Sequence, residues 1–190
     1  MSIYSSQLSS QTITNYTIAD GLISDFVECI AADVNDNIWF GTSVGIQKFD
    51  GANWITYTTA DGLVNDNVKV ITAASNGNIW VGTDFGSSQF DGTSWVIYDN
   101  TNGLNSSQVK SIDEDVNGGI WVGTNQGVSY FDGNTWESYS SPRHHPITFG
   151  NDEYGFVISG SYLDDVYKYD KANDLWVQLQ DIPFTWRVIA

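Results

Sequence analysis

Short segments of alternating polar and hydrophobic positions run along the chain, and no segment shows the period of a helix. The segments are rich in Val, Ile, Thr, Tyr and Trp, and clusters of Gly, Asn and Asp separate them, as is typical of antiparallel strands joined by tight turns. The first clear unit is predicted to contain four strands, near Val27–Ala32, Asn37–Thr42, Gly45–Asp50 and Asn53–Thr58. The pattern therefore predicts an all-β protein.

The predicted strand pattern repeats with a period of 41 residues. Each unit contains a Gly-Leu pair, a first tryptophan, a Phe-Asp-Gly turn and a second tryptophan. These landmarks fall at Gly21, Gly62 and Gly103, at Trp39, Trp80 and Trp121, at Phe49, Phe90 and Phe131, and at Trp54, Trp95 and Trp136. A four-stranded unit of about 40–45 residues that repeats in this way has the size of a β-propeller blade. The sequence predicts a β-propeller of four-stranded antiparallel blades.

Two residue types inside the repeats indicate close packing between blades. A glycine falls in the second strand of each unit, at Gly41, Gly82 and Gly123, where a missing side chain usually admits a neighbouring group. The six tryptophans in register are flanked by Val, Ile and Phe. We therefore expect them to wedge between blades as core residues, and the alternative is that they form exposed platforms for sugars.

The register changes after Tyr139, and a fourth unit of a different pattern follows. We expect blades at about 27–58, 68–99, 109–140 and 146–180, within one domain spanning residues 1–190. Residues 13–18 resemble an outer strand, and residues 184–189 resemble an inner strand of another blade. These terminal strands could close the ring within one chain or through another copy, which would make a homo-oligomer.

Charge and composition exclude several classes of partner. The chain has 7 Lys and Arg against 23 Asp and Glu, for a net charge of −16, and an anionic surface repels nucleic acids and anionic lipids. No apolar run approaches the roughly 18 residues of a membrane span, so no membrane insertion is expected. No export signal is visible at the amino terminus. The single cysteine, Cys29, cannot form a disulfide within the chain.

The residues from Asp33 to Asp50, with the core Asn37–Thr42, resemble the two-component regulator propeller repeat. Residues 79–83 and 120–124 match that repeat more closely, whereas the fourth unit resembles a Kelch repeat. The resemblance implies a propeller of the kind found in the extracytoplasmic sensory half of bacterial hybrid histidine kinases, which detects glycan fragments, or in secreted and surface proteins. It therefore implies an extracytoplasmic or secreted location and supplies no catalytic residue.

Several potential sites have a simpler structural explanation. The acidic turn Asp33–Asn37 begins like a calcium loop but lacks its glycine and distal glutamate, so we expect turn chemistry and no metal. Cys29 takes the place of Val70 and Ser111 in the other repeats, which favours a packed residue over a reactive thiol. No cofactor-binding motif is present, and none is expected.

The best candidate site residues vary at fixed positions of the repeat, because a rigid scaffold holds such positions while their chemistry differs. The connections into the inner strands place them around one mouth of the propeller: Asp25, Glu28, Asp66, Lys69 and Lys110. Arg143 and His144 in the fourth unit are further candidates. The simpler alternative is that all of these are solvated loop ends.

The predicted function is that of a non-catalytic binding or sensory module that recognises a glycan or a protein partner at this mouth. One alternative is a lectin with a glycan site on each blade, suggested by the repeated tryptophans. A second alternative is a propeller-fold hydrolase or lyase built around Arg143, His144 and His145.

Overall fold

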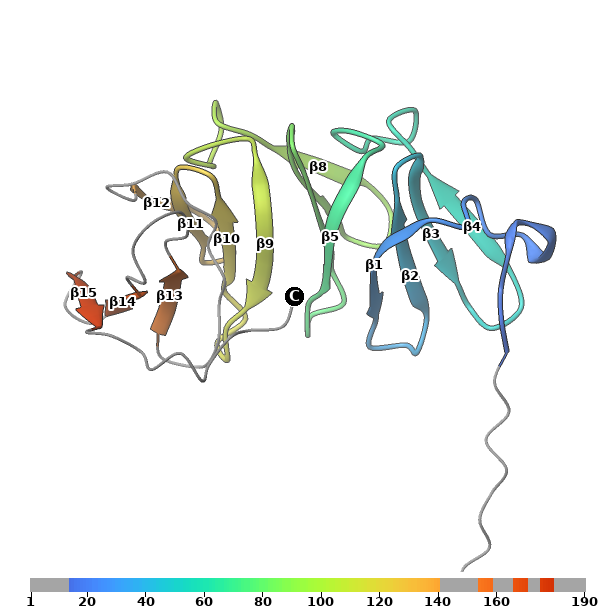
Figure 1. The fold of residues 1–190 in the computed structure, drawn as a ribbon, viewed down its shortest axis with the longest axis horizontal. Helices are drawn as coiled ribbons and strands as arrows, with labels where there is room; N and C mark the ends of the chain where they lie inside the picture. Colours follow the sequence, from blue (N-terminus) through green and yellow to red (C-terminus); the bar gives the residue numbers. More distant parts are fainter. Residues whose placement is uncertain (1–13, 141–153, 159–165, 171–174, 180–190) are drawn as a thin grey trace, which may run out of the picture.

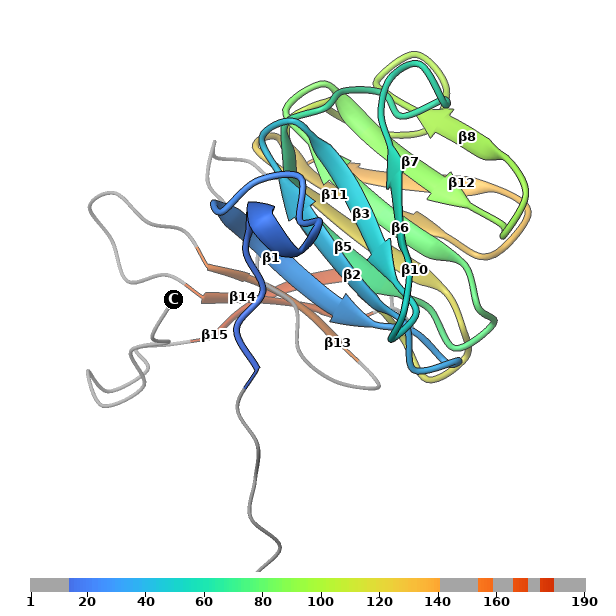
Figure 2. The same cartoon turned by 90° about the vertical axis from the view of Figure 1, so that its right-hand side faces the viewer.

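The computed structural model describes residues 14–140 and, beyond them, the backbone of three strands at residues 154–158, 166–170 and 175–179. Residues 27–140 form three four-stranded antiparallel sheets that stand side by side in chain order (Figure 1). Turned by 90°, the same sheets overlap one behind another (Figure 2). The strand order within each sheet follows the sequence, so every sheet is a meander and forms one blade of the predicted propeller.

The three blades have matching strands. Blade 1 consists of β1 (Val27–Ala32), β2 (Ile38–Thr42), β3 (Gly45–Phe49) and β4 (Trp54–Tyr57). Blade 2 consists of β5 (Val68–Ala73), β6 (Ile79–Thr83), β7 (Gly86–Phe90) and β8 (Trp95–Tyr98). Blade 3 consists of β9 (Val109–Glu114), β10 (Ile120–Thr124), β11 (Gly127–Phe131) and β12 (Trp136–Ser140). In the first unit, each predicted strand end lies within one residue of the observed one.

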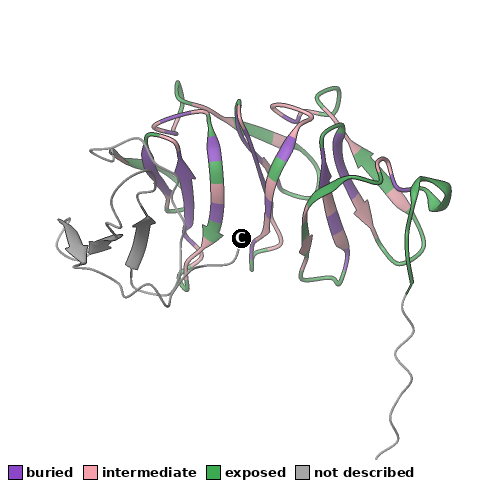
Figure 3. Ribbon diagram, in the orientation of Figure 1, coloured by how far each residue is buried: buried purple, intermediate pink, exposed green. Residues whose placement is uncertain are grey.

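Neighbouring blades meet along their first strands, where β1 contacts β5 and β5 contacts β9. The strands β6 and β10 are buried along their whole length (Figure 3). A β-carbon at Gly41 would lie 2.6 Å from Cγ1 of Val68, and one at Gly82 would lie 2.5 Å from Cγ1 of Val109. Gly41 and Gly82 therefore each receive a valine of the next blade, which confirms the predicted role of these two glycines.

Aromatic side chains fill the outer part of the interface between neighbouring blades, away from the first strands. Trp39 lies 5.8 Å from Tyr57 of its own blade and 6.0 Å from Phe90 of the next, measured between ring centroids. Trp80 repeats this arrangement with Tyr98 and Phe131. Trp39, Trp80 and Trp121 are all buried. The prediction that the first tryptophan of each repeat is a core residue is confirmed.

The outer strand expected at residues 13–18 does not form in the part of it that the structure describes. Residues 14–17 have no regular secondary structure, and Ile18–Asp20 form a short 3-10 helix, η1. Within residues 14–140 there is no further sheet with which this segment could pair, and a strand without a partner leaves its backbone groups unsatisfied. The expected terminal strand at residues 184–189 lies outside the described residues.

The fourth unit contains an antiparallel three-stranded sheet of β13 (Tyr154–Ile158), β14 (Val166–Asp170) and β15 (Leu175–Leu179). These strands lie inside the blade expected at 146–180. Its likeness to a Kelch repeat and the candidates Arg143, His144 and His145 concern residues outside those described. Among the described residues, no helix is long and apolar enough to cross a membrane.

Candidate functional site

One end of the propeller gathers the connections into the inner strands and the turns between the second and third strands. The backbone N–H of Gly45 donates to the carbonyl of Asp66 at 2.8 Å, and the N–H of Asn125 donates to the carbonyl of Gln108 at 3.2 Å. We call this end the mouth. It comprises the connections 24–28, 65–69 and 106–110 and the turns 43–44, 84–85 and 125–126.

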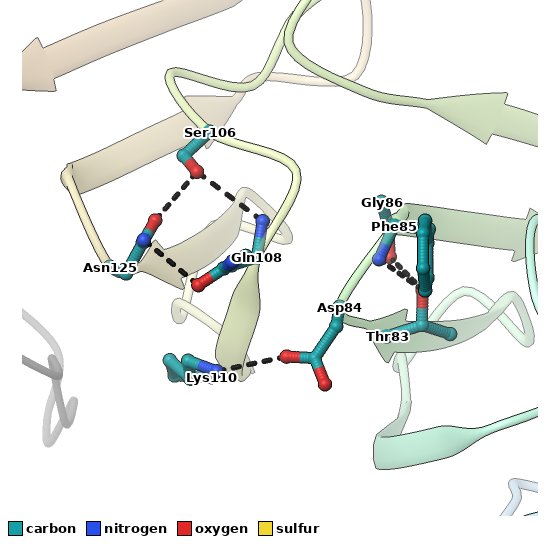
Figure 4. Close-up of polar contacts among 8 residues, drawn as sticks. All are labelled: Thr83, Asp84, Phe85, Gly86, Ser106, Gln108, Lys110 and Asn125. Atoms are coloured by element: carbon teal, nitrogen blue, oxygen red, sulfur yellow. Dashed lines mark hydrogen bonds and ion pairs between the residues drawn. The ribbon is translucent and has the colours of Figure 1, made fainter.

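Exposed charges occupy one equivalent position on the three first strands. Glu28 on β1, Lys69 on β5 and Lys110 on β9 are exposed, as the sequence predicts for a solvated mouth. Nζ of Lys110 lies 2.9 Å from Oδ1 of Asp84 in the β6–β7 turn of the preceding blade (Figure 4). Within residues 14–140 no second ion pair occurs, and Ser43 stands where a partner for Lys69 would be expected. Lys69 is therefore exposed and has no carboxylate partner within residues 14–140.

The candidates Asp25 and Asp66 lie at the mouth, but their carboxylates are used within the fold. Oδ1 of Asp25 accepts a hydrogen bond from the backbone N–H of Ile18 at 2.9 Å. Oδ1 of Asp66 accepts one from the N–H of Thr59 at 2.7 Å. Both bonds tie the end of one blade to the connection into the next. These two carboxylates, like the ion-paired Lys110, are therefore engaged within the fold, in contrast to Lys69.

The turns between second and third strands present apolar side chains that the sequence analysis did not single out. Phe85 is 63% exposed and Val44 is 47% exposed, at equivalent positions of blades 2 and 1. The turn beneath Phe85 is held by Thr83, whose hydroxyl donates to the carbonyl of Gly86 at 3.0 Å and accepts from the N–H of Phe85 at 3.0 Å (Figure 4). The sequence signal that could have identified this position is a residue that differs between the three repeats and lies between a Thr and a Gly that all three share.

Blade 3 presents a polar cluster at the same place. The hydroxyl of Ser106 donates to Oδ1 of Asn125 at 2.6 Å, and Nδ2 of Asn125 donates to Oε1 of Gln108 at 2.9 Å (Figure 4). Gln126 is exposed where blade 2 has Phe85. Among the described residues, the mouth thus combines two exposed aromatic rings, Phe26 and Phe85, with one unpaired cation and several amides, a mixture suited to a ligand with both apolar and polar parts.

The end opposite the mouth carries acidic turns whose oxygens are already engaged. Oδ1 of Asp33 accepts from the N–H groups of Asn35 and Asn37, and Oδ2 accepts from Nε1 of Trp39 at 2.9 Å. Burial opposes ionisation of Asp33, but the hydrogen bonds from Trp39 and Asn37 prevail and lower its pKa. These donors occupy the oxygens that a calcium ion would need, and no cluster of three metal-ligating side chains occurs among the described residues.

Cys29 lies half-buried on β1 beside Gly41. Burial raises the pKa of its thiol to about 11, so the thiolate is scarce at neutral pH. This result supports the predicted packing role for Cys29.

Two of the outer tryptophans, Trp95 and Trp136, lie between blades, whereas Trp54 packs against Tyr16 ahead of blade 1. Trp54, Trp95 and Trp136 are half-buried, and the ring of Trp95 stacks on Phe90 at 4.8 Å between centroids while Tyr57 of the preceding blade meets its edge. A β-carbon at Gly62 would lie 2.9 Å from Cβ of Trp95, so the connection between the blades passes directly over this tryptophan. The three inner tryptophans are buried and the three outer ones pack against neighbouring aromatic rings, which favours a packing role over a sugar platform.

Comparisons with known proteins agree with this architecture. The family model described as "Two component regulator propeller" matches residues 21–44, 62–85 and 103–126. A solved extracellular domain assigned to the hybrid two component system BT3049 of B. thetaiotaomicron has a TM-score of 0.64 at 21% identity, over 85% of this chain and 23% of that one. An extracellular domain assigned to the one component system BT4673 of the same organism has a TM-score of 0.65 at 19% identity, over 80% of this chain and 25% of that one.

The fold also occurs in an enzyme. A catalytically inactive variant of virginiamycin B lyase from Staphylococcus aureus, solved with quinupristin, has a TM-score of 0.64 at 16% identity, over 84% of this chain and 58% of that one. At these identities the likenesses show the fold alone, and this chain spans about a quarter of the two extracellular domains. A search of curated proteins finds no match. The chain is a β-propeller that carries three repeats of the two component regulator propeller family.

Proposed function

We propose that this propeller is a non-catalytic binding or sensory module that recognises a glycan or a protein partner at its mouth. The observation that carries the proposal is the set of exposed side chains that differ between blades at positions where the backbone is the same. Val44, Phe85 and Gln126 form one such set, and Glu28, Lys69 and Lys110 form another. A rigid scaffold with variable side chains at one end is the usual design of a recognition surface.

The chemistry of the mouth supports recognition more readily than catalysis. Its exposed rings, Phe26 and Phe85, offer apolar surface, and Lys69 offers a charge without a carboxylate partner among the described residues. Two carboxylates of the mouth, Asp66 and Asp84, are engaged by a backbone N–H and by Lys110. A general acid or base would need a carboxyl group with a perturbed pKa that faces the ligand.

We further propose that the module works outside the cytoplasm. Two of the structurally similar proteins are extracellular domains of signalling systems, which supports this location by analogy of fold. The net charge of −16 keeps such a surface away from nucleic acids and anionic lipids. Fractionation of the source cells, followed by detection of the protein in each fraction, tests the location.

The experiment for the binding function is a screen of the whole chain against arrays of glycans and of peptides, with each hit measured again by calorimetry. We expect Phe85→Ser and Lys69→Ala each to weaken binding by roughly tenfold or more, because each removes a group from the centre of the mouth. Val116→Ala is the matched control, since Val116 is 64% exposed at the opposite end. A hit whose affinity is unchanged in both mouth variants contradicts the proposal.

The lectin alternative with one site per blade has less support, because three of the repeated tryptophans are buried and the other three are half-buried against aromatic neighbours. The hydrolase or lyase alternative depends on Arg143, His144 and His145, and the similarity to a lyase concerns the fold. Turnover of an array hit that is abolished by His144→Ala or His145→Ala would favour that alternative over simple binding.

A further inference from the structure

Lys69 and Lys110 stand at the same position of the repeat but have different neighbours. Nζ of Lys110 lies 2.9 Å from Oδ1 of Asp84, which belongs to the β6–β7 turn of the preceding blade (Figure 4). The equivalent turn of blade 1 carries Ser43 in place of that aspartate, and no carboxylate within residues 14–140 pairs with Lys69. The repeat therefore shows which group pairs with a lysine at this position, namely a carboxylate on the side of the preceding turn.

The surface between Lys69 and the turn of blade 1 is open to solvent. Ser43 and Lys69 are both exposed. The turn is fixed against the connection into blade 2, because the backbone N–H of Gly45 donates to the carbonyl of Asp66 at 2.8 Å. A ligand at the mouth can therefore reach the lysine from the side on which an aspartate meets its equivalent in the next blade.

Apolar side chains border this surface. Val44 in the turn of blade 1 is 47% exposed, and Phe85 at the same position of blade 2 is 63% exposed. Phe26 is 81% exposed and precedes Val27, which pairs with Thr42 at the start of the blade 1 turn. A ligand whose carboxylate meets the lysine therefore places its neighbouring atoms against apolar side chains, and their burial favours an apolar group at that end of the ligand.

Asn67 adds a polar group between the turns of blades 1 and 2, because it follows Asp66 and precedes Val68. Its Oδ1 is buried and has no hydrogen-bond partner among the described residues. In blade 3, Oε1 of the equivalent Gln108 accepts from Nδ2 of Asn125 at 2.9 Å. The terminal torsion of a half-buried asparagine is broad, so a small rotation turns its oxygen toward the mouth. An acceptor without a donor costs free energy, so Asn67 favours a ligand that brings an N–H.

We propose that the surface beside Lys69 binds the free carboxyl terminus of a peptide whose last residue is apolar. The peptide carboxylate pairs with Nζ of Lys69, as the aspartate does with the equivalent lysine of the next blade. The last side chain lies against Val44 and Phe85, and the last amide N–H donates to Oδ1 of Asn67. A sugar acid would bring hydroxyl groups to this apolar border. The inference rests on the proposed function, because it names the class of ligand for the same mouth.

The test is a titration of the whole chain with the peptide acetyl-Ala-Ala-Leu, followed by the NMR shifts of the backbone amides of residues 43–45. We expect saturable shifts with the free carboxylate. The same peptide with a carboxyl-terminal amide should bind roughly tenfold more weakly or worse, because it has no charge for Lys69. Isocaproate has the carboxylate and the apolar group without the amide N–H, and it should also bind more weakly than the peptide.

Ser43→Asp is the variant that separates this site from the rest of the mouth, because it gives Lys69 the partner that Lys110 already has. We expect it to weaken binding of the peptide by roughly tenfold or more, since the new carboxylate pairs with the lysine and repels the ligand. Ser43→Asn is the matched control. It has the same size without the charge, and Asn125 occupies this position in blade 3, so binding should be unchanged. Position 43 is exposed, so both variants keep the fold.

Three results overturn the proposal. They are equal binding of the peptide and its amide, equal binding by Ser43→Asp and Ser43→Asn, and binding of isocaproate or acetate as tightly as the peptide, which would make Lys69 a general anion site. A glycan or protein whose binding is lost in Phe85→Ser but kept in Ser43→Asp removes the peptide site and leaves the proposed function of the mouth standing. If neither the arrays nor the peptide yields binding at the mouth, both are wrong.

Discussion

The side chain of Val68 lies where a β-carbon at Gly41 would be, with only 2.6 Å between Cγ1 of the valine and that position. Val109 and Gly82 repeat the relationship at 2.5 Å. Each blade therefore contacts the next with backbone against side chain, which lets first strands approach closely and buries both valines completely.

This contact predicts the effect of adding one carbon. Gly82→Ala should lower the free energy of unfolding by about 1–3 kcal/mol, because the new methyl group overlaps Val109 in a packed interior. Urea denaturation measures the change. The double variant Gly82→Ala with Val109→Ala should lose less than the sum of the two single variants, and strict additivity would contradict the contact.

Asp33 predicts a pH-dependent contribution to stability. Because its hydrogen bonds lower the pKa in the folded state, the contribution is present above the unfolded pKa, near 3.8, and is lost as the pH falls through the lower folded value. Asp33→Ala should cost about 1–3 kcal/mol at pH 7, since Nε1 of Trp39 and the turn amides lose their acceptor. Denaturation of both proteins from pH 7 to pH 2 should show the difference shrinking at the acid end.

Lys110 and Asp84 form an ion pair that should contribute little to stability. Both side chains are more than a third exposed, so solvent screens their attraction, and Asp84→Asn should change the free energy of unfolding by less than about 1 kcal/mol. Chemical denaturation at low and high salt measures this. A larger, salt-independent loss would show that the pair supports the β6–β7 turn rather than the surface chemistry of the mouth.

Cys29 should react slowly in the folded protein. Its pKa of about 11, raised chiefly by burial, leaves little thiolate at pH 8, so alkylation by iodoacetamide should be much slower than in the urea-unfolded chain. The alkylation rate of the folded chain should rise with pH toward that value. A folded-state rate equal to the unfolded one would show that the thiol is neither buried nor protected.

The sequence alone determined the strands, the turns and the packing of the blades. Alternation of side chains, turn residues and the 41-residue landmarks are local properties, so β1 to β12 and the roles of Gly41, Gly82 and Trp39 could be read from them. Glu28, Lys69 and Lys110 are exposed at equivalent positions, and their role in binding a ligand stays a prediction.

Only the tertiary structure decided which segments pair, which side chains find hydrogen-bond partners and which side chains stay exposed. Residues 14–18 have the sequence of an outer strand but form none, because a strand needs a partner that sequence similarity does not supply. Asp25 and Asp66 resemble ligand groups in sequence, yet backbone donors seven residues earlier in the same connection engage them. The exposure of Phe85 and of Val27 likewise depends on which neighbours are present, and burial is a property of contacts between segments far apart in the chain.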